Sequence, residues 1–253
     1  MFANERRNKI LELLSRRSSV TVTELTGLFQ VSLETIRRDL EYLEKQGALK
    51  RVHGGALSMN RMQSYTGLSE RSTEHQTEKR QIARAALSHI REGERIALDA
   101  GTTTSELAHL LCDSFQELTI VTASLPIFEI LSAKPGFQVI LTGGFYLPGE
   151  NAFYGHLALD MIRQLHVSAF FHAPSALSLN FGMSEHIREL VEVQRALIAA
   201  ADQVFVLADS SKFETCAALK VCDLSPRFLY LTDSGLSDEI RDAWKKASLD
   251  IIL

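Results

Sequence analysis

The chain has few cysteines for its length, three in 253 residues. These three, Cys112, Cys216 and Cys222, form no CxxC pair, and no histidine lies at metal-ligand spacing from them. This pattern excludes the common zinc sites and a disulfide framework. We therefore expect reduced cysteines with a structural role, no bound metal and no cofactor.

Long hydrophobic runs are also missing, since no run of about 18 uncharged apolar residues occurs. The first ten residues, "MFANERRNKI", are charged and do not resemble the apolar region of an export signal. We expect a cytoplasmic protein without a membrane partner. Hydrophobic residues make up 45% of the chain, enough for one large or two smaller folded domains.

The charge is unevenly distributed along the chain. Residues 1–58 contain ten Lys and Arg against seven Asp and Glu, a net charge of +3, whereas the remaining 17 basic and 24 acidic residues give −7. A basic N-terminal head on an acidic body is compatible with a solvated helical surface. It indicates a DNA contact only if the basic residues share one face.

The head has the pattern of three helices. Residues 4–17 carry an apolar stripe at helical spacing, and Val20 and Val22 follow in a short extended stretch. Thr23 is the expected cap of a second helix, which ends near Gln30. Ser32 is the expected cap of a third helix that runs to about residue 46.

The third helix has an apolar face and a charged face. The apolar face holds Ile36, Leu40 and Leu43, the opposite face holds Glu34, Arg38, Glu41 and Lys45, and Thr35 and Arg37 flank the stripe. Two helices joined by a short turn, the second with outward arginines, form the sequence pattern of a helix-turn-helix. The stretch 48–58, "ALKRVHGGALS", has the composition of a two-stranded wing.

The motif "TIRRDL-x-x-LE-x-x-G-x-L-x-R-x-HGGA" within residues 35–56 resembles the winged helix-turn-helix of DeoR-type bacterial transcription regulators. The resemblance implies that Ser32, Thr35, Arg37 and Arg38 lie nearest the DNA. It also implies that the wing residues Lys50, Arg51 and His53 lie beside the backbone or the minor groove. An arginine can pair with a guanine or grip a phosphate, and the sequence does not decide between the two.

After residue 58 the pattern changes twice. Residues 59–76 are rich in Ser, Thr, Gln and Arg without a sustained period, so we interpret them as a linker. Residues 77–253 alternate between helical segments, one of them over about 185–200, and apolar strands. This alternation predicts an α/β domain with a mainly parallel sheet, in which ligands bind at the carboxyl ends of strands.

The first polar strand end is "ALDAGTTTSEL". Asp99 closes a strand, Gly101 permits a tight turn, and Thr102, Thr103 and Thr104 open a helix. Backbone N–H groups at a helix start, joined by threonine hydroxyls, can hold a phosphate. The same residues are also suited to ordinary helix capping.

Two further strand ends are polar or rich in glycine. Asp209 and Lys212 follow a strand directly in "VLADSSKF", and they could contact a sugar phosphate or simply form a turn. Gly143 and Gly144 in "ILTGGFYLPGE" indicate a turn or a close backbone approach.

Together, "DAGTTT", "LTGG" and "ADSSKF" resemble the effector domain of DeoR-type regulators, which is similar to sugar-phosphate isomerases. The resemblance implies that the turn at residues 102–104 holds a phosphate, with Asp99, Asp209 and Lys212 around the ligand. The chain departs from the family pattern at His172, Pro174 and Ser175, where relatives commonly have a G-x-D-G-like turn.

We therefore expect a DNA-binding regulator, a repressor controlled by a phosphorylated sugar or related metabolite. We expect a homodimer or homotetramer, because a single helix-turn-helix contacts little DNA. One alternative is an isomerase-like enzyme, for which Asp209, Glu185 and His186 are possible bases. The other is a regulator whose C-terminal domain only oligomerises. No paired-carboxylate signature supports catalysis, so we assign no catalytic residues.

Overall fold

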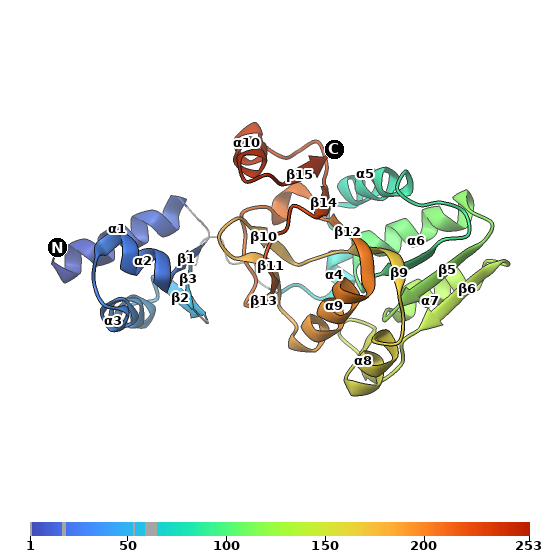
Figure 1. Ribbon diagram of the computed structural model, residues 1–253, viewed down its shortest axis with the longest axis horizontal. Helices are drawn as coiled ribbons and strands as arrows, with labels where there is room; N and C mark the ends of the chain where they lie inside the picture. Colours follow the sequence, from blue (N-terminus) through green and yellow to red (C-terminus); the bar gives the residue numbers. More distant parts are fainter. Residues whose placement is uncertain (1, 17–18, 53, 59–64) are drawn as a thin grey trace.

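The computed structural model describes residues 2–16, 19–52, 54–58 and 65–253. They form a small N-terminal head and a larger C-terminal α/β domain (Figure 1). Within these ranges, no helix combines the length and the apolar character needed to cross a membrane.

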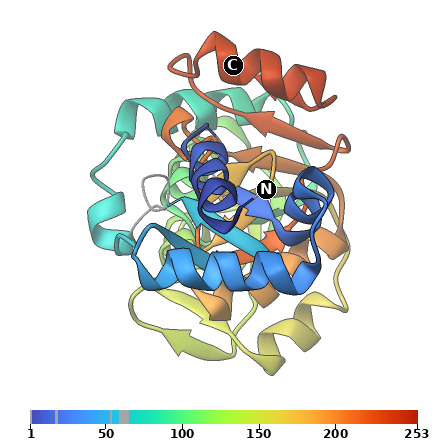
Figure 2. The same cartoon turned by 90° about the vertical axis from the view of Figure 1, so that its left-hand side faces the viewer.

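The head consists of three helices and a three-stranded antiparallel sheet. Its elements are α1 (Ala3–Arg16), β1 (Ser19–Thr21), α2 (Val22–Phe29), α3 (Leu33–Lys45), β2 (Leu49–Val52) and β3 (Gly55–Ser58). The strand order is β1-β3-β2, so the predicted wing of two strands is joined by a third strand that precedes α2. Figure 2 shows the head end-on, with its helices in front of the larger domain.

The cap residue predicted from the sequence is confirmed for α3 but not for α2. Ser32 caps α3, and its Oγ accepts a hydrogen bond from the backbone N–H of Thr35 at 3.2 Å. The predicted cap of α2, Thr23, is wrong because it already lies inside the helix. The hydroxyl of Thr21, on extended backbone, accepts instead from the N–H of Glu24 at 3.1 Å.

One buried carboxylate ties α1 to α3. Asp39 is 2% exposed. It accepts hydrogen bonds from Nε of Arg6 at 2.5 Å and from Nε of Arg7 at 2.8 Å. The Arg7 guanidinium also lies 3.8 Å from the ring centroid of Tyr42. Asp39 therefore fixes the orientation of α3 against the first helix.

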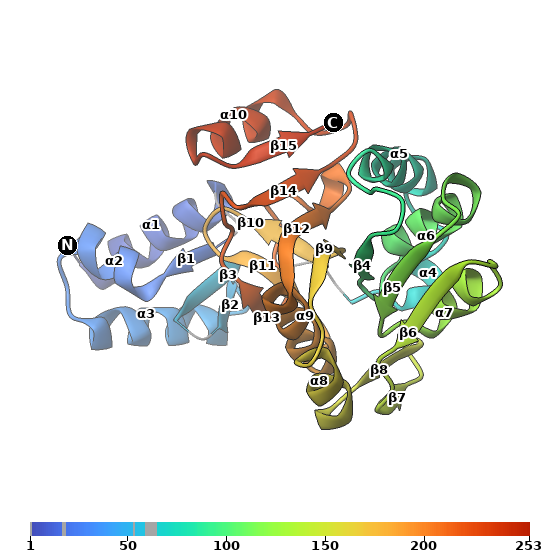
Figure 3. The same cartoon turned by 45° about the vertical axis from the view of Figure 1, so that its right-hand side comes forward.

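The C-terminal domain is built on a seven-stranded sheet in the order β15-β14-β12-β9-β4-β5-β6 (Figure 3). Its strands are β4 (Arg95–Leu98), β5 (Leu118–Thr122), β6 (Phe137–Leu141), β9 (Val167–His172), β12 (Ala201–Leu207), β14 (Phe228–Leu231) and β15 (Asp250–Ile252). Every neighbouring pair is parallel, which confirms the predicted fold class.

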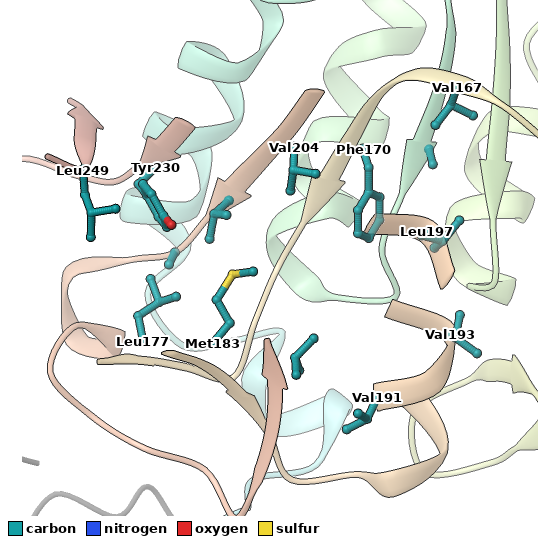
Figure 4. Packing of buried hydrophobic residues seen from close by; sticks show 14 of the residues in the cluster. Val167, Phe170, Leu177, Met183, Val191, Val193, Leu197, Val204, Tyr230 and Leu249 are labelled. Carbon is teal, nitrogen blue, oxygen red and sulfur yellow. The ribbon is translucent and has the colours of Figure 1, made fainter. Parts of the chain in front are cut away.

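Helices cover both faces of this sheet, as a parallel sheet with apolar strands requires. One face is covered by α5 (Gln76–Leu87), α6 (Thr102–Ser114) and α7 (Leu125–Ser132), and the other by α8 (His156–Ile162), α9 (Arg188–Ala200) and α10 (Asp238–Lys246). Figure 4 shows the hydrophobic core between the sheet and the second of these helix layers, in which Phe170 and Val204 of the sheet pack near Leu197 of α9.

The strand order reverses between β4 and β9. After β4 the chain adds β5 and β6 on one side, and it then returns to place β9, β12, β14 and β15 on the other. In open parallel sheets, ligands bind in the crevice outside the carboxyl ends of the strands at such a reversal. The fold therefore directs attention to the segments that follow β4, β9 and β12.

Several elements were not expected from the sequence. A second antiparallel sheet holds β10 (Ala176–Ser178), β11 (Gly182–Glu185) and β13 (Leu219–Cys222), and β7 (Phe145–Leu147) pairs with β8 (Ala152–Tyr154). Because residues 182–185 pair with two strands, the helix expected from about residue 185 begins only at Arg188.

The described part of the expected linker contains helical structure. Residues 65–75 include the short helix α4 (Leu68–Arg71), and α5 begins directly after them at Gln76. Tyr65 and Arg71 of this segment bind the buried carboxylate of Glu150, which belongs to the turn between β7 and β8.

We predict that Asp39→Ala lowers the free energy of unfolding of the head by about 3–5 kcal/mol, because it leaves two arginines without their buried partner. Amide hydrogen exchange of α1 and α3 in the full chain measures this. The matched control is Glu34→Gln, since the exposed Glu34 carboxylate pairs with Arg38 at 3.3 Å. This control should cost less than about 1 kcal/mol. Equal effects of the two substitutions would contradict the anchoring role of Asp39.

Candidate functional site

A polar cavity of about 350 Å³ lies at the carboxyl edge of the parallel sheet. It is lined by Tyr65, Thr66, Arg71, Glu74, His75, Lys79, Thr102, Ser175, Glu185, His186, Asp209, Ser211 and Lys212. These residues come from the ends of β4, β9 and β12, from β11 and the residue after it, and from the segment around α4. The lining contains three basic and three acidic side chains, so the cavity suits a ligand with both charge and hydroxyl groups.

Of the three threonines predicted to hold a phosphate at the start of α6, one lies on the surface of the cavity. Thr102 lines the cavity. The hydroxyl of Thr104 donates to the backbone oxygens of Asp99 and Gly101 at 2.8 and 2.9 Å, so it caps the turn. Thr103 is buried, and its Oγ1 has no hydrogen-bond partner in the described part of the chain. A Cβ on Gly101 would approach the Ala173 Cβ to 3.0 Å, so glycine permits close packing of two strand ends.

Asp99 lies behind the cavity and not on its surface. The side chain is 2% exposed. Its Oδ2 accepts from Nδ1 of His172 at 2.6 Å, from the N–H of Ala173 at 3.2 Å and from Nε2 of Gln194 at 3.3 Å. Asp99 therefore joins the ends of β4 and β9 to α9. A contact between Asp99 and a ligand remains a prediction.

Asp209 and Lys212, which the sequence predicts to lie around the ligand, both line the cavity after the end of β12. Asp209 accepts hydrogen bonds from the N–H and hydroxyl of Ser211, and it caps the 3₁₀ helix η2 (Ser210–Lys212). Nζ of Lys212 donates to the backbone oxygen of Pro174 at 2.9 Å. Burial lowers the pKa of Lys212, and the Asp209 carboxylate opposes that shift.

The predicted glycines Gly143 and Gly144 lie outside the cavity lining, in the turn after β6. Both have positive φ, 64° and 105°. A Cβ on Gly144 would lie 2.4 Å from the backbone oxygen of Tyr154. These glycines are thus required by the turn that leads into the β7–β8 hairpin.

Sequence reasoning missed most of the basic charge in the cavity. Arg71 lies in the expected linker, and Lys79 lies near the start of α5. The rule that ligands lie at strand ends does not reach either residue, because both precede the first strand of the sheet. Lys79 is 4% exposed. Burial and then the neighbouring Lys212 ammonium lower its pKa to about 8.

Of the three residues that depart from the family pattern, Ser175 lines the cavity. Ser175 donates to Oε1 of Glu185 at 2.7 Å, and Gln194 donates to Oε2 of Glu185 at 3.3 Å. His172 is fully buried against Asp99. Burial also lowers the pKa of His186, whose Nε2 has no hydrogen-bond partner in the described ranges. Glu185 thus has both oxygens engaged within the protein.

The predicted DNA-facing residues that the structure describes lie on the surface of the head. Arg37, Arg38, Lys50 and Arg51 are exposed. The Ser32 and Thr35 hydroxyls lie 2.8 Å apart at the start of α3, and Arg51 pairs with Glu44 at 3.1 Å. His53 lies outside the described residues.

Metal ligands do not gather anywhere in residues 2–16, 19–52, 54–58 and 65–253, where no group of three His, Cys, Asp or Glu side chains could hold an ion. Cys112 and Cys222 are free thiols, and Cys216 is buried.

Two family models match the chain. The DeoR-like helix-turn-helix domain matches residues 6–62, and the DeoR C terminal sensor domain matches residues 74–234. The division agrees with the head and the α/β domain described above.

Full-length relatives carry related names. A transcriptional regulator of Bacillus subtilis (strain 168), described as an uncharacterized HTH-type regulator, is 38% identical over 236 residues, covering 93% of this chain and 91% of that protein. The lactose phosphotransferase system repressor of Staphylococcus epidermidis is 35% identical over 235 residues, covering 91% and 92%. A putative aga operon transcriptional repressor of Escherichia coli O157:H7 is 32% identical over 255 residues, covering 99% and 93%.

Among solved structures, ribose 5-phosphate isomerase A from Neisseria gonorrhoeae aligns at 17% identity with a TM-score of 0.40, covering 54% of this chain and 53% of that one. A similarity this low carries no argument about function. The family models and the full-length relatives, in contrast, match both the head and the α/β domain. The chain therefore belongs to the DeoR family of DNA-binding transcriptional regulators.

Proposed function

We propose that this DeoR-family protein is a repressor whose operator affinity is controlled by a phosphorylated sugar or a related metabolite. The observation that carries the proposal is the cavity at the strand reversal, where Arg71, Lys79 and Lys212 line one polar space beside the start of α6. Names of relatives such as the lactose phosphotransferase system repressor are consistent with sugar-linked regulation.

The phosphate is expected between the basic side chains and the first turn of α6. Backbone N–H groups at a helix start favour an anion, and Thr102 adds a hydroxyl there. Lys79 and Lys212 repel each other across the cavity, as the lowered pKa of Lys79 reflects. A bound dianion replaces this repulsion with attraction.

The sugar hydroxyls are expected to meet the acidic and hydroxyl-bearing side chains of the lining. Asp209, Ser175 and Ser211 are among them. A carboxylate accepts hydrogen bonds from hydroxyl groups, and serine can donate or accept. A phosphorylated polyol offers a group to both the basic and the hydroxyl-binding side chains, whereas inorganic phosphate offers one mainly to the basic side chains.

On the DNA side, we propose that α3 enters the major groove and that Lys50 and Arg51 contact the backbone from the wing. Two heads are needed for a specific operator, so the protein acts as a homodimer or homotetramer. Effector binding then changes the relative placement of paired heads, a coupling of separate sites through two arrangements of the protein.

A catalytic role is not part of the proposal. Glu185, one of the bases that the sequence offered, accepts hydrogen bonds on both oxygens from Ser175 and Gln194. Such a carboxylate positions neighbouring groups and is poorly placed to take a proton from a substrate.

Selection of duplexes from a randomised DNA pool tests the function. The full chain should enrich a repeated half-site motif, and a mixture of pentose and hexose phosphates should abolish or strengthen the enrichment. Arg38→Ala should weaken binding to the selected duplex by about 1–3 kcal/mol with relaxed sequence preference if Arg38 reads a base, or lower the salt slope by about 1 if it grips a phosphate. Arg227→Ala removes an exposed arginine of the α/β domain and should change neither property.

No motif with the wild-type chain would contradict the repressor function. A motif that ignores every sugar phosphate would contradict the proposed effector and would leave the DNA-binding function standing.

Lys212→Ala should leave operator affinity without effector unchanged and should raise the sugar-phosphate concentration needed for half-maximal response at least tenfold, since a charge-assisted bond contributes about 1.5–3 kcal/mol. Fluorescence titration of labelled operator measures both quantities. Lys246→Ala is the matched control, because Lys246 is exposed on α10 and does not line the cavity. A full response in Lys212→Ala would show that the effector binds elsewhere.

The pH dependence of effector affinity follows from Lys79, whose pKa of about 8 is set by burial and Lys212 and opposed by Asp209. A bound phosphate dianion raises that pKa, so binding takes up a proton wherever the free protein has lost it. Affinity should therefore fall as the pH rises above about 8, while Lys79→Met should flatten this part of the profile. Calorimetric titrations between pH 7 and about 9.5 measure the slope. Affinity that stays constant over this range in the wild type would contradict the placement of the anion.

A further inference from the structure

The cavity is closed on one side by residues 65–79, which we call the strap. The strap contains α4 and the first turn of α5. It supplies six of the lining residues: Tyr65, Thr66, Arg71, Glu74, His75 and Lys79. The strap is also the part of the α/β domain nearest in sequence to the head, since only residues 59–64 separate it from the end of β3 at Ser58.

One buried carboxylate fastens the strap to the rest of the domain. Glu150 is 2% exposed. The Tyr65 hydroxyl donates to its Oε1 at 2.8 Å, and Nη2 of Arg71 donates to its Oε2. The Tyr65 ring also makes an edge contact with the His186 ring, with centroids 6.1 Å apart. Glu150 thereby holds the start of the strap at Tyr65 and the end of α4 at Arg71 against the turn between β7 and β8.

A lysine fixes the main chain of the strap from inside. Nζ of Lys79 donates to the backbone oxygens of Arg71 and Glu74, the second at 2.6 Å. An ammonium group has three N–H donors, so one donor of Lys79 remains for a ligand in the cavity that it lines. A ligand bound to Lys79 therefore acts on the same group that shapes the strap.

The strap and the sheet edge carry like charges that face each other. Arg71 and Lys79 belong to the strap, whereas Lys212 belongs to the end of β12. Nε of Arg71 is buried without a hydrogen-bond partner in the described part of the chain. The fastening by Glu150 thus works against repulsion from Lys212, and the buried Nε of Arg71 is a donor that an anion in the cavity can satisfy.

We infer that the strap is the element through which the cavity controls the head: a phosphate held jointly by Arg71, Lys79 and Lys212 draws the strap onto the sheet edge, and the chain leading to the wing follows. This inference rests on the proposed function, because it requires an anion in the cavity. Glu150 is the positioning residue that holds the strap ready for the anion.

The short connection makes the mechanism direct. The chain from Ser58 to Tyr65 spans at most about 25 Å when fully extended, so a displacement of the strap limits where the wing of the same chain can lie. In a paired regulator, a shift of each head changes the spacing of the two recognition helices on DNA.

Hydrogen exchange of the full chain tests the inference, with inorganic phosphate as the probe and sodium chloride at equal ionic strength as the reference. Phosphate at ten times its Kd should slow exchange about tenfold in the first turn of α6, in η2 and in residues 68–79 of the strap. Slowing in α6 and η2 without slowing in the strap would overturn the inference and leave the proposed site intact. If phosphate slows none of the three segments, the proposed site fails and the inference fails with it.

Glu150→Gln separates the strap from the anion site. The amide removes the charge that holds Arg71, so strap amides should exchange about tenfold faster without phosphate, while phosphate still protects the first turn of α6. Tyr65→Phe removes one hydroxyl and should give a smaller change in the same segment, which keeps the test available if the first variant folds poorly. Glu106→Gln, which removes the partner of Arg80 at 3.3 Å outside the cavity, is the control and should leave strap exchange unchanged. Strap exchange at the wild-type rate in both Glu150→Gln and Tyr65→Phe would overturn the role of Glu150.

Discussion

The site depends on one constraint of the fold, the reversal of strand order between β4 and β9. Parallel strands bring their carboxyl ends to one edge, and the reversal opens a crevice there because the following segments turn to opposite sides. Thr102 after β4, Ser175 after β9 and Lys212 after β12 meet in one cavity for this reason. Buried contacts such as Asp99 with His172 then fix the strand ends against each other.

The electrostatics of the cavity follow from its burial. Lys79 and Lys212 both have lowered pKa values because they are removed from water, and Lys212 further lowers the pKa of Lys79. Burying these ammonium groups near each other costs free energy. A bound anion offsets that cost, so the cavity suits an anionic ligand. Since Arg71 and Lys79 belong to the segment that leads from the head, the proposed anion would bind where it can act on the DNA-binding unit.

Local signals predicted much of this protein. The Ser32 cap, the outward Arg37 and Arg38, and the parallel sheet follow from side-chain periodicity and from residue preferences at helix starts. The sequence identified Asp209 and Lys212 as candidate ligand contacts because they follow an apolar strand, and both line the cavity. The cap of α2 was assigned two residues too late, because Thr21 and Thr23 are equally good cap residues and only the backbone geometry distinguishes them.

Long-range contacts explain what the sequence could not show. Arg71 lines the cavity while it is bound to Glu150, which is far away in the chain. Gly143 and Gly144 belong to a motif that resembles the effector domain of the family, but they lie outside the cavity lining, in a turn that leads into a hairpin. Asp39 lies three residues after Ile36 and four before Leu43, on the apolar side of α3, but only the structure shows the two arginines of α1 that pair with it.

The central claim is that the cavity and the head are energetically coupled, and coupling between two binding equilibria is reciprocal. The most direct measurement is calorimetric titration of an effective sugar phosphate into the protein, free and saturated with its selected operator. We predict that operator changes the Kd of the sugar phosphate by the same factor by which the sugar phosphate changes operator affinity, about 5- to 150-fold. Identical sugar-phosphate affinities in the free and the DNA-bound protein would contradict the account.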